Sequence, residues 1–369
     1  MAETTRESPE LELEPAIWRE PVRGGHPDVS LLGLSGIDQL RTFFQGTTPL
    51  PPLHHLMGLR PSHVGPAAAT FVMPATEWLL SPPGYITLGV LATVADGGLG
   101  CAVQSVLPPA TPYTTSDLSL TFLRPAVADG ELIAVRGRVI HAGRSLAVAE
   151  AMIEDGQGRP LAHGTTRCFV LPAIDPPPVA PDPLPLVPPA DYGTPDPYER
   201  RPVAGAVVEQ EDWDRLSGLD VMRALMAGDL PAPPICHLTG LRPVEVAEGR
   251  STFALPSTGW LTSPIGTVQG GSIALVADNA LAAAVQTTVG PRTTFSPLDL
   301  KVNYLRPVFA DGRDIQATAT VVHRGRSLAV AQAEVRNADG KPVALATGTA
   351  LIREGVPWRL EEAGPPEDA

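Results

Sequence analysis

The sequence predicts an α+β fold in which one domain is written twice, each copy a long antiparallel sheet wrapped around a central helix. Three observations lead to this prediction. The sequence matches itself after a shift of 182 residues, each copy holds one long apolar stretch of small residues, and each copy then continues with four β-rich segments. A chain of 369 residues, 43% of them hydrophobic, can fill two domain-sized cores.

The internal repeat keeps one register throughout. The shift places "PPLHHLMGLRP" on "PPICHLTGLRP" and "HAGRSLAVAE" on "HRGRSLAVAQ", with roughly four positions in ten identical over about 140 residues. A unit of this length indicates a duplicated domain rather than a solenoid repeat. We therefore expect domain 1 over residues 31–172 and domain 2 over residues 213–354.

The segments outside the two domains have biased compositions. Residues 1–30 are acidic and are expected to be flexible, as is the acidic tail over residues 355–369. Residues 173–212 are rich in proline, which predicts an extended, semi-rigid linker.

Each domain is expected to begin with a short helix and a strand. In "SGIDQLRTFFQG" a serine cap, apolar residues at helical spacing and a closing glycine predict a helix. The segments "ATFVMP" and "STFALP" predict strands that end at proline. The stretches Ile86–Val106 and Val268–Thr288 are apolar nearly all round and too long for one strand, so each is predicted to be a buried helix.

The β-rich segments follow the buried helix. In domain 1 they are "TSDLSLTFLRP", "ELIAVRGRVIHAG", "RSLAVAEAMIED" and "RPLAHGTTRCFVL", separated by turn residues. Leu118, Leu120 and Phe122 alternate with polar residues in the first of them. This alternation is typical of a sheet that is covered on one face, which the central helix would provide.

Composition argues against several classes of partner. A net charge of −13 disfavours nucleic acid and anionic membrane surfaces as partners, and no run of about 18 apolar residues predicts a membrane span. The N-terminus lacks the pattern of a secretory signal, so we expect a cytoplasmic protein. Cys101, Cys168 and Cys236 are widely spaced, which indicates reduced thiols and neither a disulfide framework nor a metal site.

Together these motifs resemble the PaaI branch of the hotdog-fold thioesterases. The resemblance rests on a helix that opens with "GG", an aspartate seven residues after the second glycine, and the motifs "DLxxxxLRP" and "HxGRSxAxA", and it covers both domains. In this family the helix start reads Asn, Gly and His-Gly-Gly ahead of the aspartate. Here Ser replaces Asn and Gln replaces His, and the corresponding residues are Ser263, Gly266, Gln269, Gly270, Gly271 and Asp278. Acyl-CoA thioesterases of the two-hotdog TesB type share the duplicated architecture, but their second-domain signature is not visible.

The resemblance implies two tandem hotdog domains that form an intrachain pseudo-dimer, with their helices side by side. In the family one subunit supplies the helix start and the other supplies the carboxylate, assisted by a Ser or Thr two positions before "DL". A first site would then combine Gln269 and Gly270 of domain 2 with Asp96 and Thr115 of domain 1. The resemblance also implies further association of pseudo-dimers into a homo-oligomer.

A second site would combine Thr87 and Leu88 of domain 1 with Asp278 of domain 2. Leucine would crowd the approach to the helix start there, and Pro297 replaces the hydroxyl residue, for which Ser296 could substitute only in part. The second site is therefore predicted to be degenerate.

The implied reaction is the hydrolysis of acyl-CoA thioesters to a free acid and CoA. It needs a donor for the thioester oxygen, which we assign to the Gly270 N–H, and a carboxylate that acts as general base or nucleophile. Gly271 and Ser263 would help to bind the substrate at the helix start. Arg144 and Arg326 could contact CoA phosphates or lie in solvated turns. No cofactor is implied, because the CoA moiety belongs to the substrate.

Structural roles compete with these assignments. A glycine pair can serve close helix packing alone, and a helical aspartate can be a cap or a buried hydrogen-bonding group. The rival function is an acyl-CoA or acyl-carrier binding protein without turnover, which the replacement of the family's Asn and His favours. A hotdog hydratase is disfavoured, because no Asp/His pair has the spacing of that chemistry.

Overall fold

One continuous antiparallel sheet of twelve strands forms the centre of the computed structural model, which describes residues 13–176, 184–188 and 190–358. The strands of domain 1 are β1 (Arg60–Gly65), β2 (Ala68–Pro74), β3 (Tyr113–Phe122), β4 (Leu132–Ala142), β5 (Leu146–Glu154) and β6 (Pro160–Val170). Those of domain 2 are β7 (Arg242–Ala247), β8 (Arg250–Pro256), β9 (Thr293–Tyr304), β10 (Asp314–Arg324), β11 (Leu328–Arg336) and β12 (Pro342–Glu354). Their order, β1-β2-β4-β5-β6-β3-β9-β12-β11-β10-β8-β7, is a mirror repeat about the middle of the sheet.

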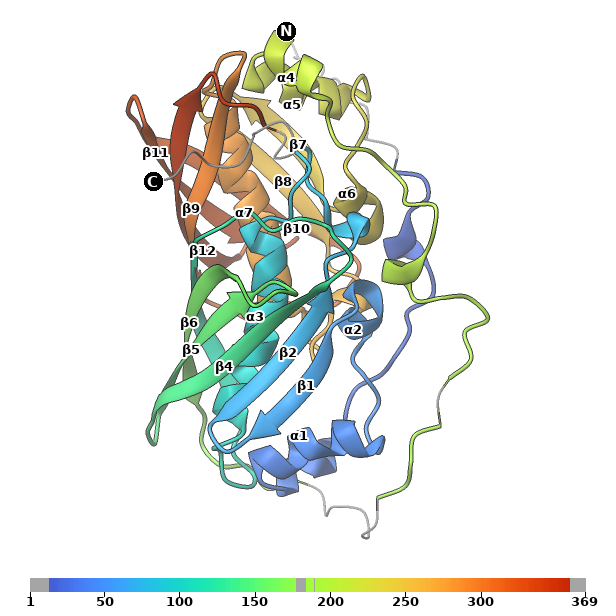
Figure 1. Cartoon of the computed structure of the whole chain (residues 1–369). Coiled ribbons are helices and arrows are strands. Elements are labelled where there is room, and N and C mark those ends of the chain that lie inside the picture. Colours follow the sequence, from blue (N-terminus) through green and yellow to red (C-terminus); the bar gives the residue numbers. More distant parts are fainter. Residues whose placement is uncertain (1–12, 177–183, 189, 359–369) are drawn as a thin grey trace, which may run out of the picture.

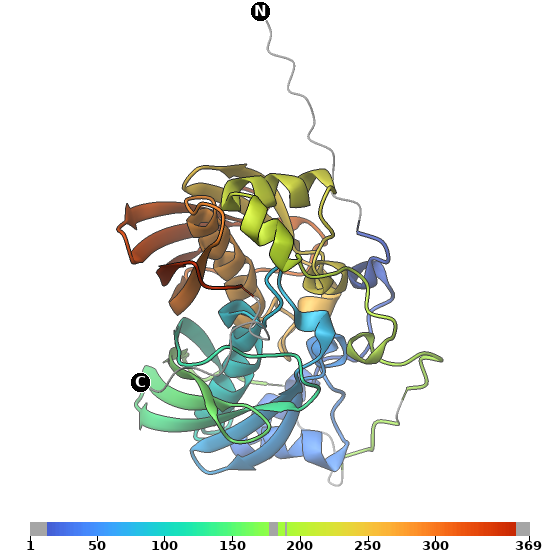
Figure 2. The ribbon, with the colours of Figure 1, turned by 45° about the horizontal axis from the view of Figure 1, so that its top comes forward.

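The sheet curves around two long helices, α3 (Leu88–Gln104) and α7 (Gly270–Gln286), as Figures 1 and 2 show. Both lie within the two stretches predicted to be buried helices, and both pack against each other and against strands of their own domain. Their starts cross very closely, because a Cβ atom at Gly271 would lie 2.4 Å from Thr93 Cα, and one at Gly89 would lie 2.8 Å from Leu275 Cα. The glycine at the second position of each helix is therefore required for packing.

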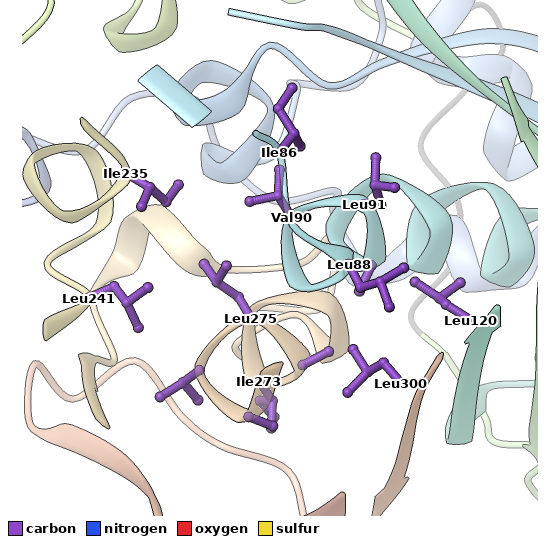
Figure 3. Close-up of a cluster of buried hydrophobic side chains, with 14 of the residues drawn as sticks. Ile86, Leu88, Val90, Leu91, Leu120, Ile235, Leu241, Ile273, Leu275 and Leu300 are labelled. Atoms are coloured by element: carbon purple, nitrogen blue, oxygen red, sulfur yellow. The ribbon is translucent and has the colours of Figure 1, made fainter. Parts of the chain in front are cut away.

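The two domains join through strands β3 and β9, which pair with Leu118 opposite Val302 and Leu120 opposite Leu300. All four side chains are buried. Figure 3 shows Leu120 and Leu300 in an apolar cluster with residues of both central helices. The predicted pair of tandem hotdog domains is confirmed, and the pseudo-dimer shares one sheet and one core.

The remaining helices lie before each domain's first strands. The predicted helix after Ser35 is confirmed as α1 (Gly36–Gln45): the Ser35 hydroxyl accepts a hydrogen bond from the Asp38 N–H, and Gly46 ends the helix in the left-handed conformation. The others are α2 (Pro52–Met57), α4 (Gln210–Arg215), α5 (Gly218–Ala227) and α6 (Pro234–Thr239). No helix within the described ranges is long and apolar enough to cross a membrane.

The segments that precede the two domains pack on each other's domain. Trp260 of domain 2 donates its indole N–H to the carbonyl oxygen of Glu20 at 3.0 Å, and Trp78 of domain 1 donates to the carbonyl oxygen of Arg200 at 2.9 Å. The side chains of Arg200 and Glu20 form an ion pair where the two segments meet. Each segment is thus exchanged between the domains.

This exchange corrects the expectation of a flexible N-terminal segment. The N-terminal segment is not flexible from residue 13 to residue 30, since Leu13 and Ile17 are buried in the core. The last part of the linker is likewise held in place around Trp78. The first twelve residues, residues 177–183 and 189 of the linker, and residues 359–369 of the tail lie outside the described residues. At the start of the tail, Trp358 is buried and stacks on Trp213 with ring centroids 4.5 Å apart.

Separating the domains is expected to expose apolar surface and cause aggregation. A fragment of residues 31–172 loses the α7 contact, the β9 pairing and the segment around Arg200 that covers Trp78. Expression of that fragment alone should give insoluble protein, whereas residues 1–176 co-expressed with residues 184–369 should form a soluble 1:1 complex. Size-exclusion chromatography measures both, and a soluble, monodisperse monomer of residues 31–172 would contradict the prediction.

Candidate active site at the start of helix α7

Asp96 of domain 1 lies against the first turn of helix α7 of domain 2. Its Oδ2 accepts a hydrogen bond from the Gly271 N–H at 3.2 Å, and the Gly270 N–H also stabilises the carboxylate. Helix α7 has no side-chain cap of its own, because the Gln269 side chain makes no cap hydrogen bond. The carboxylate from the other domain thus takes the place of the missing cap.

Asp96 and Gly270 keep part of their surface open to solvent, although their surroundings are apolar. Burial raises the pKa of Asp96 to about 6, against hydrogen bonds from Gly271, Thr115 and Gly270 that favour the ionised form. A carboxylate with such a pKa is ionised at neutral pH and still basic enough to accept a proton in a reaction.

The space beside Gly270 is defined by two side chains. A Cβ atom at Gly270 would lie 3.1 Å from Asp96 Oδ2 and 3.2 Å from the hydroxyl oxygen of Tyr304. These separations are tighter than ordinary van der Waals contact, so a glycine here leaves room for both polar groups. The helix start, Asp96 and Tyr304 therefore face the same small space.

Thr115 lies near Asp96 as predicted. Its hydroxyl lies 3.4 Å from Asp96 Oδ1, which is long for a hydrogen bond between oxygen atoms. The pairing of β3 with β6 shifts register between Thr115 and Asp117, so a bulge lies directly beside this residue. Bulges of this kind re-aim side chains next to functional sites.

Gln269 and Ser263 make mainly structural contacts. The Gln269 side chain is buried and donates from Nε2 to the Thr93 carbonyl oxygen at 3.1 Å, which ties helix α7 to helix α3. Its Oε1 is buried without a hydrogen-bond partner in the described structure. The Ser263 N–H donates to the Thr267 carbonyl oxygen at 2.8 Å and closes the turn before the helix. Within the described residues, neither side chain forms a hydrogen bond with Asp96.

Arg144 and Arg326 lie in the exposed turns β4–β5 and β10–β11, respectively. No recorded hydrogen bond or ion pair joins either guanidinium to the carboxylates of Asp96 or Asp278. Their predicted contact with a substrate stays a prediction.

The second site has the same backbone arrangement, but its carboxylate and the first residue of its helix are buried. Asp278 Oδ2 accepts a hydrogen bond from the Gly89 N–H at 2.8 Å, the Thr87 hydroxyl also stabilises the ionised form, and burial raises the pKa of Asp278 to about 6. Asp278 is only 4% exposed and Leu88, the counterpart of Gly270, only 1%. Figure 3 shows Leu88 within the buried apolar cluster.

The expected substitute hydroxyl of the second site makes another contact. The Ser296 hydroxyl accepts a hydrogen bond from the Arg353 guanidinium at 3.0 Å and is not recorded near Asp278. Pro297 occupies the position of Thr115. A cavity of about 50 Å³ lies beside this site, lined in part by Tyr85, Thr87 and Asn279.

Sequence reasoning missed Tyr304. The hydroxyl of this β9 residue donates to the Gly270 carbonyl oxygen at 2.8 Å. The sequence contained a signal for this residue, namely the difference between Tyr304 and Phe122, its counterpart in domain 1. The differences between the two domains around their helix starts therefore include four positions: Gln269 against Thr87, Gly270 against Leu88, Thr115 against Pro297, and Tyr304 against Phe122.

The first site places a carboxylate that can act as a general base or as a nucleophile next to an N–H donor. Asp96 can accept a proton or attack a carbonyl carbon, and the helix start can stabilise a developing negative charge. In the part of the chain that the structure describes, no group of three or more His, Cys, Asp or Glu side chains could hold a metal ion.

Comparison with known proteins gives two family matches in one chain. Residues 84–162 and 265–344 each match the family model described as the thioesterase superfamily. Each match covers a central helix, its start and the next three strands, and ends at the beginning of the last strand of its domain. Both Asp96 and Asp278 lie inside the matched regions.

Individual proteins are similar over one domain or both. A protein of Vibrio cholerae with a provisional esterase name is 25% identical over 145 residues, 39% of this chain and 92% of that protein. The solved tesB protein of Mycobacterium avium subspecies paratuberculosis matches 82% of this chain and 98% of its own, with 14% identity and a TM-score of 0.51. The phenylacetic acid degradation protein PaaI of Thermus thermophilus matches 32% of this chain and 97% of its own, with 32% identity and a TM-score of 0.30.

Proposed function

Because this chain belongs to the thioesterase superfamily and carries two hotdog domains in tandem, we propose that it hydrolyses acyl-CoA thioesters at the first site, between the domains. The observation that supports this proposal best is the meeting of Asp96 from one domain with the glycine helix start of the other. The matching family model is that of the thioesterase superfamily and the Vibrio cholerae relative bears an esterase name, which agrees with this chemistry.

In the proposed reaction the thioester carbonyl lies over Gly270, where the lack of a side chain leaves room. The carbonyl oxygen accepts a hydrogen bond from the Gly270 N–H, while the Gly271 N–H continues to donate to Asp96. As a general base, the carboxylate takes a proton from water while the water oxygen attacks the carbonyl carbon; the C–S bond breaks and the CoA thiolate leaves with that proton. As a nucleophile, the carboxylate attacks the carbonyl carbon and expels the CoA thiolate, and water then hydrolyses the resulting anhydride to the free acid and regenerates Asp96. The donor at the helix start stabilises the oxyanion, and no cofactor takes part.

Purified protein incubated with a panel of acyl-CoAs and a reagent for free thiols tests the proposal. Release of CoA that requires Asp96 supports it. Binding of the same acyl-CoAs without thiol release would support the rival function of an acyl-CoA binding protein.

The rate of hydrolysis is expected to depend on the ionisation of Asp96. Since the pKa of Asp96 is raised to about 6 and only the carboxylate is active, kcat/KM should rise about tenfold per pH unit below pH 6. Above about pH 7 it should level off, because the group is then fully ionised. A pH series of kcat/KM measures this, and a rate that is flat between pH 5 and pH 7 would contradict the assignment of Asp96 as the base.

A second function, binding without turnover, is favoured only at the second site. The cavity of about 50 Å³ beside Asp278 has space for about four water-sized groups, enough for a short acyl chain. Calorimetry of butyryl-CoA with the Asp96→Asn variant tests this idea, with two molecules bound per chain as the supporting result and one as the opposing result. Ala282→Leu, which would fill part of the cavity, should remove the second molecule.

A further inference from the structure

The peptide unit between Gly270 and Gly271 is held at both of its polar ends. Its carbonyl oxygen, on Gly270, accepts the hydrogen bond from the Tyr304 hydroxyl at 2.8 Å. Its N–H, on Gly271, donates to Asp96 Oδ2 at 3.2 Å. One peptide plane thus links a phenol of domain 2 to the carboxylate of domain 1.

Hydrogen bonds arranged in such a chain strengthen one another. A donor on a carbonyl oxygen withdraws electron density from the amide and makes its N–H a better donor. The better N–H in turn favours the ionised form of the carboxylate that it contacts. The Tyr304 hydroxyl therefore acts on Asp96 through the peptide, without a recorded hydrogen bond between the two side chains.

The hydrogen bond from Tyr304 also fixes the orientation of the Gly270–Gly271 peptide. The Gly270–Gly271 peptide lies in the first turn of helix α7, so the helix already sets its approximate direction. Neither glycine has a side chain that could add a contact, and the Tyr304 hydroxyl supplies one from the sheet. Tyr304 lies on β9, a central strand of the sheet, and is therefore a rigid anchor. The hydroxyl fixes the plane whose N–H orients Asp96.

We propose that Tyr304 is the positioning residue of the first site, which holds the Gly270–Gly271 peptide so that Asp96 is kept ionised and correctly oriented for attack. The effect of Tyr304 on kinetics rests on the proposed function. Its effect on the ionisation of Asp96 is a property of the free protein. The second site lacks this device, because its counterpart Phe122 has no hydroxyl.

The thiols and phenols around Asp96 titrate far above its range, and the signal of Asp278, whose pKa is also raised to about 6, is identified with the Asp278→Asn variant. Thr115 does not titrate. Burial raises the pKa of Cys101 on its own helix and of Cys168 on β6 to about 12. Burial also raises the pKa of Tyr113 on β3 and of Tyr304 well above the usual range. Asp117 on β3 is held in an ion pair with Arg167.

The test is the Tyr304→Phe variant, which keeps the ring and removes only the hydroxyl. The carboxyl pKa of Asp96 is followed by ¹³C NMR in the free protein, and kcat and KM are measured against pH. We expect the carboxyl pKa and the acidic limb of kcat/KM to move upward together by about half a unit. We also expect kcat on the plateau to fall about tenfold, with little change in KM.

Phe122→Tyr is the matched control, since it adds a hydroxyl at the equivalent position of domain 1. It should leave the titration of Asp96 and the kinetics unchanged. A Tyr304→Phe variant whose Asp96 pKa does not move would overturn the inference, even if its activity falls. The NMR titration needs no turnover, so it separates this failure from a failure of the proposed function, which wild-type protein without thioester hydrolysis would reveal.

Discussion

Asp96→Asn is expected to lower kcat for thioester hydrolysis by about 100-fold or more, while Asp278→Asn costs much less. Asp96 is the partly exposed carboxylate beside the glycine helix start, so its replacement removes the proposed base. Asp278 and Leu88 are both buried and the Asp278 carboxylate accepts the Gly89 N–H, so this carboxylate is not available to attack a thioester. Steady-state kinetics of the two variants measure the difference.

Thermal unfolding supplies the control for this comparison. The folded-state pKa of Asp96, about 6, lies above its ordinary value of 3.8. The folded protein therefore loses stability as the pH rises through this range, and above it the ionised group is a net cost. Asn at position 96 removes that cost, so at pH 8 the Tm of Asp96→Asn should be no lower than that of the wild type. Equal losses of activity in both variants, or a large fall in Tm for Asp96→Asn, would contradict the proposed asymmetry.

The fold could be predicted because the signals that determine it are repeated and local. The long apolar stretches reflect helices that are buried on all faces, and the alternation in β3 reflects a strand that is buried on one face. The duplication provides each of these signals twice. The exchanged N-terminal segments could not be predicted in this way. They form only single turns around Ile17 and Tyr198, and what holds them in place is a pair of distant tryptophans, Trp78 and Trp260.

The meeting of Asp96 and Thr115 with the glycine helix start could be expected from the sequence, whereas the contacts that shape this place could not. The difference between Gly270 and Leu88 was visible, but the reason for the glycine was not, since it depends on where the Asp96 and Tyr304 oxygens lie. Tyr against Phe is a small difference in sequence. It gains weight only because β9 brings the hydroxyl onto the Gly270 carbonyl oxygen. Gln269 was interpreted as a catalytic group, yet its recorded contact is a tie between the two helices.

Gly270→Leu, which copies residue 88 of domain 1, is expected to lower kcat/KM by about 100-fold. The N–H donor survives the substitution, so the damage must be steric. The new Cβ would lie where Asp96 Oδ2 and the Tyr304 hydroxyl leave only 3.1 and 3.2 Å, and the rest of the side chain would fill the space proposed for the thioester carbonyl. A block of this kind should cost about as much as the loss of one oxyanion donor, roughly 3 kcal/mol.

The reciprocal change, Leu88→Gly, tests whether the glycine alone makes a site. It should restore little activity in the Gly270→Leu background, because Pro297 still lacks a hydroxyl and Phe122 still lacks the contact that Tyr304 makes. Leucine is a better helix former than glycine, and helix α3 already begins with it, so circular dichroism should show a folded Gly270→Leu protein. Unchanged kcat/KM in Gly270→Leu would remove the start of helix α7 from the mechanism, and would favour binding without turnover as the function of this pair of domains.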